Sequence, residues 1–165
     1  MTEKILSGRI AIITGANQGL GREISKSYVT AGANVMLCAR NYDLLEKVEL
    51  ELKPLLGENQ KIFLKKCDVT NENEVNVLVN DTLDKLGGCQ ILVNNAGIYG
   101  PKGAIEDQDW DEWKKAIEIN VFGSVLMCRA LIPHFKRQNY GKIIQLSGGG
   151  ATKPLPNLSV YATSK

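Results

Sequence analysis

The chain has 165 residues, of which 44% are hydrophobic and 23% are charged, and its formal net charge is +2. This length predicts one domain, residues 1–165, with a buried core, and the composition excludes a collagen, a coiled coil or a disordered tail. The 20 basic residues are scattered rather than clustered, so a nucleic-acid partner is not expected. No apolar stretch appears long enough to span a bilayer and no apolar leader precedes the first strand, so we expect no membrane partner and a cytoplasmic protein.

Cysteine and histidine usage gives no sign of a metal site. The four cysteines are widely spaced, form no C-x-x-C pair, and are accompanied by a single histidine. Buried reduced thiols in a reducing compartment are therefore preferred to disulfides or zinc. We expect no metal ligands in this chain.

Short apolar runs alternate with amphipathic stretches along the chain. The runs are apolar at consecutive positions, which is typical of strands buried on both faces of a parallel sheet. We predict strands at Ile10–Thr14, Asn34–Ala39, Lys61–Lys66, Gln90–Asn94 and Lys142–Leu146. Helices are predicted at Leu20–Thr30, Tyr42–Leu56, Glu72–Leu86 and from about Asp109 to Gln138.

Two of the helices carry local signals. Asn71 is a candidate N-cap for the third helix. Pro133 lies inside the fourth, which it is expected to kink or end. Strand and helix alternation of this kind predicts an α/β fold, a doubly wound parallel sheet with helices on both faces.

A glycine-rich turn follows the first strand. The segment Thr14–Gly21 reads TGANQGLG, and glycines between a strand and a helix let backbone amides and the positive helix end approach a pyrophosphate. The spacing differs from G-x-G-x-x-G, and no Gly-Lys-Ser/Thr follows, so the turn is not a P-loop. A plain strand-to-helix turn is the alternative interpretation of this segment.

The end of the second strand bears on the choice of cofactor. Such folds contact the adenosine ribose there, and an acid would bind a free 2′-hydroxyl. Ala39 offers no acceptor, whereas Arg40 has the charge to bind a 2′-phosphate. The sequence thus favours NADP over NAD, with an exposed surface arginine as the alternative and with no second basic residue at Gln18.

Four further segments complete a family pattern. They are Asp68-Val69, Asn94–Gly97, Asn120 in the long helix, and Tyr161–Lys165. Together with Thr14–Gly21 they resemble the short-chain dehydrogenase/reductase family, from about Arg9 to Lys165. The resemblance implies a Rossmann-like sheet of strand order 3-2-1-4-5 and an oxidoreductase that transfers a hydride between NAD(P) and a carbonyl or alcohol.

The resemblance also implies roles for individual residues. Asp68 matches the acid that binds the adenine amino group, and Val69 matches the residue beside that ring. The turn around the pyrophosphate and ribose is matched by Gly15, Asn17, Gly19, Leu20 and Gly21, and the segment that passes the cofactor and braces the sheet by Asn95, Ala96 and Gly97. Arg40, Tyr161 and Lys165 complete the expected cofactor site.

The catalytic residues implied by the family are Tyr161, Lys165, Asn120 and Ser147. Tyr161 resembles the acid/base, Lys165 its ribose-binding partner and Asn120 the residue that holds a water in the proton relay. Positions i and i+4 share a helix face, so Lys165 is expected beside Tyr161 and assists its proton transfer. A half-buried tyrosine and a surface lysine would be the alternative for either residue alone.

The chain departs from the family pattern at the serine. Family members place a carbonyl-binding serine thirteen residues before the tyrosine, and that position is Gly148. Either Ser147 serves instead or no hydroxyl polarises the substrate carbonyl, which would cost about 10²- to 10³-fold in turnover.

The chain also stops at Lys165, where family members continue. We therefore expect a truncated fold whose C-terminal elements are missing, from a parent that is a homo-oligomer by analogy. The chief alternative function is a nucleotide-binding module without turnover; a sugar-nucleotide epimerase or dehydratase fits the motifs less well.

Overall fold

The computed structural model describes residues 4–165. The expectation that no apolar leader precedes the first strand falls in part on residues 1–3, which lie outside the described residues. Five parallel strands form one sheet in the order β3-β2-β1-β4-β5, which confirms the predicted topology. The strands are β1 (Ile10–Thr14), β2 (Asn34–Ala39), β3 (Ile62–Lys66), β4 (Ile91–Asn94) and β5 (Lys142–Gln145). Each agrees with its predicted range to within one residue at either end.

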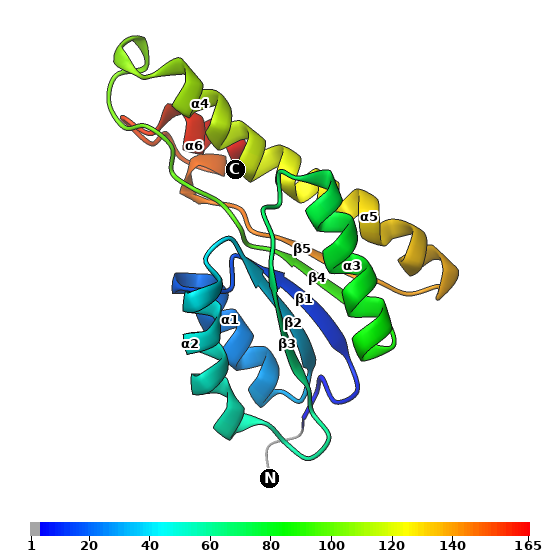
Figure 1. The fold of residues 1–165 in the computed structure, drawn as a ribbon. Coiled ribbons are helices and arrows are strands. Elements are labelled where there is room, and N and C mark those ends of the chain that lie inside the picture. The colour runs from blue at the N-terminus through cyan, green and yellow to red at the C-terminus, as the bar shows by residue number, and fades with distance from the viewer. Residues whose placement is uncertain (1–3) are drawn as a thin grey trace.

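Helices cover both faces of the sheet (Figure 1). They are α1 (Gly19–Thr30), α2 (Tyr42–Leu52), α3 (Glu72–Leu86), α4 (Trp110–Ile117), α5 (Gly123–Arg137) and α6 (Ser159–Ser164). Short 3-10 turns lie at Lys53–Leu55, Ile105–Asp107 and Gly149–Ala151, and a π-helical turn at Glu118–Phe122 joins α4 to α5. The predicted helix at 42–56 thus ends its α-helical part at Leu52, just before Pro54.

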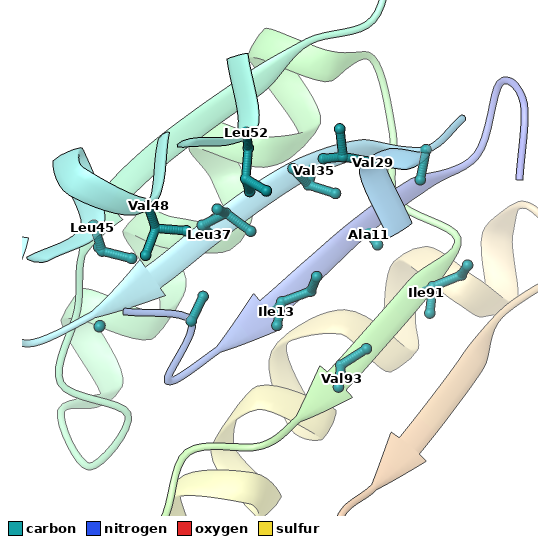
Figure 2. Packing of buried hydrophobic residues seen from close by; sticks show 13 residues of the cluster. Ala11, Ile13, Val29, Val35, Leu37, Leu45, Val48, Leu52, Ile91 and Val93 are labelled. Atoms are coloured by element: carbon teal, nitrogen blue, oxygen red, sulfur yellow. The ribbon is translucent and has the colours of Figure 1, made fainter. Parts of the chain in front are cut away.

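Two hydrophobic clusters hold the layers together. On one face, Val29 of α1 and Leu45, Val48 and Leu52 of α2 pack on β1, β2 and β4 (Figure 2). On the other face, α3 and α5 pack on alternate residues of the same strands, among them Ile12, Met36 and Leu92. Because successive strand residues point to opposite faces, consecutive apolar residues supply both clusters.

The two outer strands are less buried than predicted. All four residues of β5 are exposed, with Ile143 at 42% and Ile144 at 41%, and β3 is only partly buried. The strand order explains this difference, because β3 and β5 are the edges of the sheet, and within residues 4–165 no strand pairs with the far side of β5.

The local signals give mixed results. The Asn71 side chain accepts hydrogen bonds from the backbone of Asn73 and Glu74, which confirms the predicted cap of α3. Pro133 does not end its helix, since α5 continues to Arg137. All four thiols are free in the described residues, with Cys38, Cys67 and Cys89 buried and Cys128 half-buried.

The long helix corrects one expectation. Trp110–Arg137 runs for 28 residues and contains a window of mean hydropathy 1.4, so by length and composition it is able to cross a membrane. The search for one uninterrupted apolar stretch did not find this helix, because charged residues interrupt its apolar residues. A third of that window is buried in the fold, and a core helix of a soluble protein passes the same test, so this is weak evidence for a membrane span.

Cys89 supports a prediction about alkaline stability. Burial raises the pKa of its thiol to about 11, so the unfolded chain loses this proton at lower pH than the folded one. The contribution of the Cys89 thiol to the free energy of unfolding is therefore fully present below the ordinary thiol pKa. It is lost as the pH rises through the pKa of this thiol in the folded protein. Between pH 9 and 11, the free energy of unfolding of the wild type should therefore fall by about 2 kcal/mol more than that of Cys89→Ala. Urea unfolding under reducing conditions measures this difference, and parallel pH profiles would contradict it.

Candidate functional site

A cavity of about 540 Å³ opens at the carboxyl ends of the parallel strands, where open α/β sheets bind ligands. Its lining comes from the turn after β1, the end of β2, the loop after β3 and the loop after β4. The sequence-predicted residues among its lining are Gly15, Asn17, Gly19, Leu20, Gly21, Arg40, Asp68, Val69, Asn95, Ala96 and Gly97. The structure thus brings every predicted cofactor residue except Tyr161 and Lys165 to one cavity.

The β1–α1 turn is built by close backbone approach. Gly15 has a φ of +63°, and a Cβ there would lie 2.9 Å from the Cα of Ala96. A Cβ on Gly21 would overlap the Gly15 carbonyl oxygen. Glycine at both positions therefore lets the start of α1 and the loop after β4 lie against the same turn, with the first amides of α1 at the cavity.

Thr14 and Asn95 fasten this turn to β4. The Thr14 hydroxyl accepts from the Asn95 and Ala96 amides at 3.0 Å each, and the Asn95 side chain donates to the Thr14 and Gly15 carbonyls at 2.9 and 3.1 Å. Asn95 thus links the loop after β4 to the turn after β1. Thr14 was not among the predicted site residues, because its role depends on contacts with residues about 80 positions away.

Asp68 and Arg40 lie on the side of the cavity formed by β2 and β3. The Asp68 Oδ1 atom accepts from the Thr70 amide at 3.0 Å and from the Thr70 hydroxyl at 2.8 Å, which fixes the carboxylate. Arg40 is exposed. Behind them, hydrogen bonding to Cys67 and burial raise the pKa of the Cys38 thiol well above its usual range, so this buried thiol stays protonated at neutral pH.

Asn120 joins three segments of the chain. It is 1% exposed and lies in the π-helical turn between α4 and α5, and such turns are frequent at functional sites. Its side chain accepts from the Ile98 amide and donates to the Ile98 carbonyl and the Ser164 hydroxyl, all at 2.8 Å. Asn120 therefore holds the loop after β4 against α6.

Tyr161 lies on α6 and Lys165 directly follows the last residue of that helix, next to the cavity. The Lys165 Nζ atom is 5.9 Å from the centre of the Tyr161 ring, as the i,i+4 spacing predicts. A Cβ on Gly97, which lines the cavity, would be 3.2 Å from the same Nζ. Lys165 thus reaches the cavity wall.

The segment after β5 places Gly148, and not Ser147, beside the tyrosine. A Cβ at position 148 would lie 2.8 Å from the Tyr161 hydroxyl oxygen. The Ser147 hydroxyl instead donates to the Lys165 carbonyl at 3.1 Å. Position 148 is therefore where the spacing of thirteen residues had located it, and it carries no hydroxyl.

Burial lowers the pKa of the Lys165 amine below its ordinary value, which supports a second prediction. Over the pH range between the two values the unfolded chain binds more protons, so the stability of the wild type increases with pH there. Relative to Lys165→Met, the wild-type melting temperature should rise as the pH increases toward 10.5, the ordinary pKa of the amine. Thermal melts of both proteins across this range measure the difference, and a constant or falling difference would contradict the prediction.

Comparison with known proteins agrees with this geometry. Residues 9–165 match the family model described as short chain dehydrogenase. The chain is 36% identical over 160 residues to the 7alpha-hydroxysteroid dehydrogenase of Escherichia coli K12, covering 97% of this chain and 61% of the relative. It is 34% identical to the mouse dehydrogenase/reductase SDR family member 7B, covering 97% of this chain and 50% of that protein. The chain belongs to the short-chain dehydrogenase/reductase family.

Solved structures show the same fold with both types of cofactor. The structure of a 7 alpha-hydroxysteroid dehydrogenase with NADH and 7-oxo glycochenodeoxycholic acid matches with a TM-score of 0.89 and 34% identity, over 98% of this chain and 62% of that one. A metagenomic short-chain oxidoreductase in complex with NADP matches with a TM-score of 0.87 and 30% identity, over 97% and 71%. The chain thus spans about three-fifths of the length of the first curated relatives that it matches.

Proposed function

We propose that this chain forms the cofactor-binding part of an NAD(P)-dependent oxidoreductase that interconverts a carbonyl and an alcohol, with Tyr161 as the acid/base. The observation that carries the proposal is the position of the Tyr161–Lys165 pair. It adjoins, through Gly97, a cavity at the carboxyl ends of the strands. A proton-transferring group therefore lies next to the place where a nucleotide fits.

The residues of the cavity fit a dinucleotide. Glycines 15 and 21 leave room against the start of α1, whose first turn contains no acidic residue and suits a pyrophosphate. Asp68 and Val69 would contact the adenine, and the turn from Gly15 to Gly21 would hold the phosphates and ribose. When bound, a nicotinamide cofactor supplies hydride chemistry that no side chain offers.

The remaining groups act on the proton. Tyr161 gives its proton to the substrate oxygen during reduction and takes it back during oxidation. Lys165 binds the ribose beside it and favours the phenolate by its charge. We assign Asn120 to holding the proton-relay water, and leave Ser147 as the candidate hydroxyl named by the sequence.

Arg40 supports NADP as the cofactor, with NAD as the alternative. An exposed guanidinium at the end of β2 is free to form charge-assisted hydrogen bonds with a 2′-phosphate. Arg40→Gln should therefore weaken NADPH binding by about 10- to 100-fold and leave NADH binding nearly unchanged. Fluorescence titration with both cofactors measures this. Arg137→Gln, at the far end of α5, is the control, and equal losses for NADPH and NADH would contradict the role of Arg40.

The function itself is tested by cofactor oxidation. The full-length protein is mixed with NADPH and a panel of aldehydes and ketones, and the absorbance of the reduced cofactor is followed. Turnover that depends on the carbonyl supports the proposal. Tight NADPH binding with no turnover for any carbonyl would contradict it and support a nucleotide-binding module.

Other properties of the whole protein are proposals on the same basis. We propose a small-molecule carbonyl or alcohol substrate, a single NAD(P)-binding domain over residues 1–165, a cytoplasmic location and a homo-oligomer. The exposed apolar residues Phe122, Val125 and Ile132 on the long helix support an assembly. Sedimentation of the purified protein tests the oligomer.

A further inference from the structure

Position 148 leaves the site short of one hydroxyl. Within α6 and the segment before it, the serine and threonine hydroxyls donate hydrogen bonds to other groups of the same chain. Ser147 donates to the Lys165 carbonyl, Ser159 to the Gln108 side chain and Ser164 to the Tyr161 carbonyl. Thr163 likewise donates to the Ser159 carbonyl at 2.9 Å. Each of these hydroxyls, Ser147 included, already has an acceptor within the chain, and a hydroxyl without such a partner lies on another segment.

Tyr99 brings a phenol to this place. Its ring centre lies 4.8 Å from that of Tyr161, with 45° between the ring planes. Tyr99 also lines the cavity, which Tyr161 does not, and it is 56% exposed. Of the hydrogen bonds formed within residues 4–165, none engages the Tyr99 hydroxyl, so this group is free to meet a ligand.

The backbone on both sides of Tyr99 is fixed. Asn120 holds both the amide and the carbonyl of Ile98 at 2.8 Å. Gly100 has a φ of +71°, and a Cβ there would lie 2.5 Å from Val160 and 2.9 Å from Ala116. The chain therefore lies directly on α4 and α6 at Gly100, which holds the backbone of Tyr99 next to the helix that carries Tyr161.

The Tyr99 ring also lies near a cation. The Lys102 Nζ atom lies 5.4 Å from the ring centre, within the range of a cation–π contact. Each ring of the Tyr99–Tyr161 pair thus has its own nearby ammonium group, Lys102 for Tyr99 and Lys165 for Tyr161. This arrangement orders an exposed side chain, and ordered donors are the ones that stabilise a developing oxyanion.

We propose that Tyr99 is a catalytic residue of this site, whose hydroxyl donates a hydrogen bond to the substrate oxygen in place of a side chain at position 148. The proposal rests on the proposed oxidoreductase function. Tyr99 keeps its own proton throughout, while Tyr161 exchanges a proton with the same oxygen. The hydroxyl is worth most when negative charge develops on that oxygen, so its loss should appear in kcat more than in the binding of either ligand.

Tyr99→Phe tests this, because it removes only the hydroxyl and keeps the ring against Tyr161 and Lys102. With the best carbonyl of the panel, kcat should fall by about 10²- to 10³-fold, while the dissociation constant for NADPH, measured by fluorescence, stays within twofold. Tyr140→Phe, a 38% exposed tyrosine near the opposite end of the sheet, is the matched control and should keep the kcat of the wild type.

A second variant distinguishes the effect of the hydroxyl from that of the ring. It also keeps the proposal testable if Tyr99→Phe does not fold. Tyr99→Leu should lose kcat to the same extent as Tyr99→Phe if the hydroxyl acts. Wild-type kcat in Tyr99→Phe, or a loss seen only in Tyr99→Leu, would overturn the assignment and indicate that the ring merely packs. A parallel loss of NADPH binding would also overturn it. Absence of turnover in the wild type would instead overturn the proposed function, and this inference with it.

Discussion

Tyr161→Phe is expected to lower the kcat for carbonyl reduction by about 10²- to 10⁴-fold, which is the usual contribution of a positioned acid/base. The phenyl ring keeps its packing against Tyr99 at 4.8 Å and its place beside Lys165, so only the proton donor is lost. Steady-state rates of NADPH oxidation measure the effect. The dissociation constant for NADPH should change little, because Tyr161 does not line the cavity.

Thr163→Ala is the control for this experiment. Thr163 lies on the same short helix, is exposed, and donates only to the Ser159 carbonyl. It should retain the kcat of the wild type. Comparable activity in Tyr161→Phe and Thr163→Ala would show that Tyr161 is not the acid/base, and a loss in both would indicate that α6 tolerates no substitution.

The Tyr161–Lys165 pair shows what local sequence is able to predict. Four residues of helix fix the relation between Tyr161 and Lys165, and the strands that carry the cavity were predicted because consecutive apolar residues mark a sheet covered on both faces. Glycine spacing located the turn after β1 for a similar reason, since its geometry depends on adjacent residues. These parts of the fold rest on interactions within a short window.

Contacts between distant segments were not predictable in this way. Tyr99 lies 62 positions before Tyr161, and its own surroundings in the sequence carry no chemical signal. Likewise, the exposure of β5 depends on which elements pack beside it, and the consecutive apolar residues of the strand do not reveal this. Counting back from Tyr161 located Gly148 as the position where the family has its serine. Only the structure shows that the Ser147 hydroxyl donates to the Lys165 carbonyl and that Gly148 lies beside Tyr161.

Gly21→Ala is expected to lower the free energy of unfolding by about 2–3 kcal/mol and to weaken NADPH binding by at least about 10-fold. The added methyl group would overlap the Gly15 carbonyl oxygen and lie 2.5 Å from the Asn95 side-chain nitrogen. Neither atom moves freely, since the two are hydrogen-bonded to each other at 3.1 Å. The start of α1 must therefore shift away from the turn, and the amides that face the cavity shift with it.

Gly87→Ala separates this overlap from the general cost of replacing a glycine. Gly87 ends α3 with a φ of +82°, and a Cβ there meets no atom within 4 Å, so its substitution costs only the left-handed conformation, about 1 kcal/mol. It lies outside the cavity and should leave NADPH binding unchanged. Urea unfolding and fluorescence titration of both variants measure the two effects. If Gly21→Ala bound NADPH like the wild type, the assignment of the turn between β1 and α1 as the phosphate site would be contradicted.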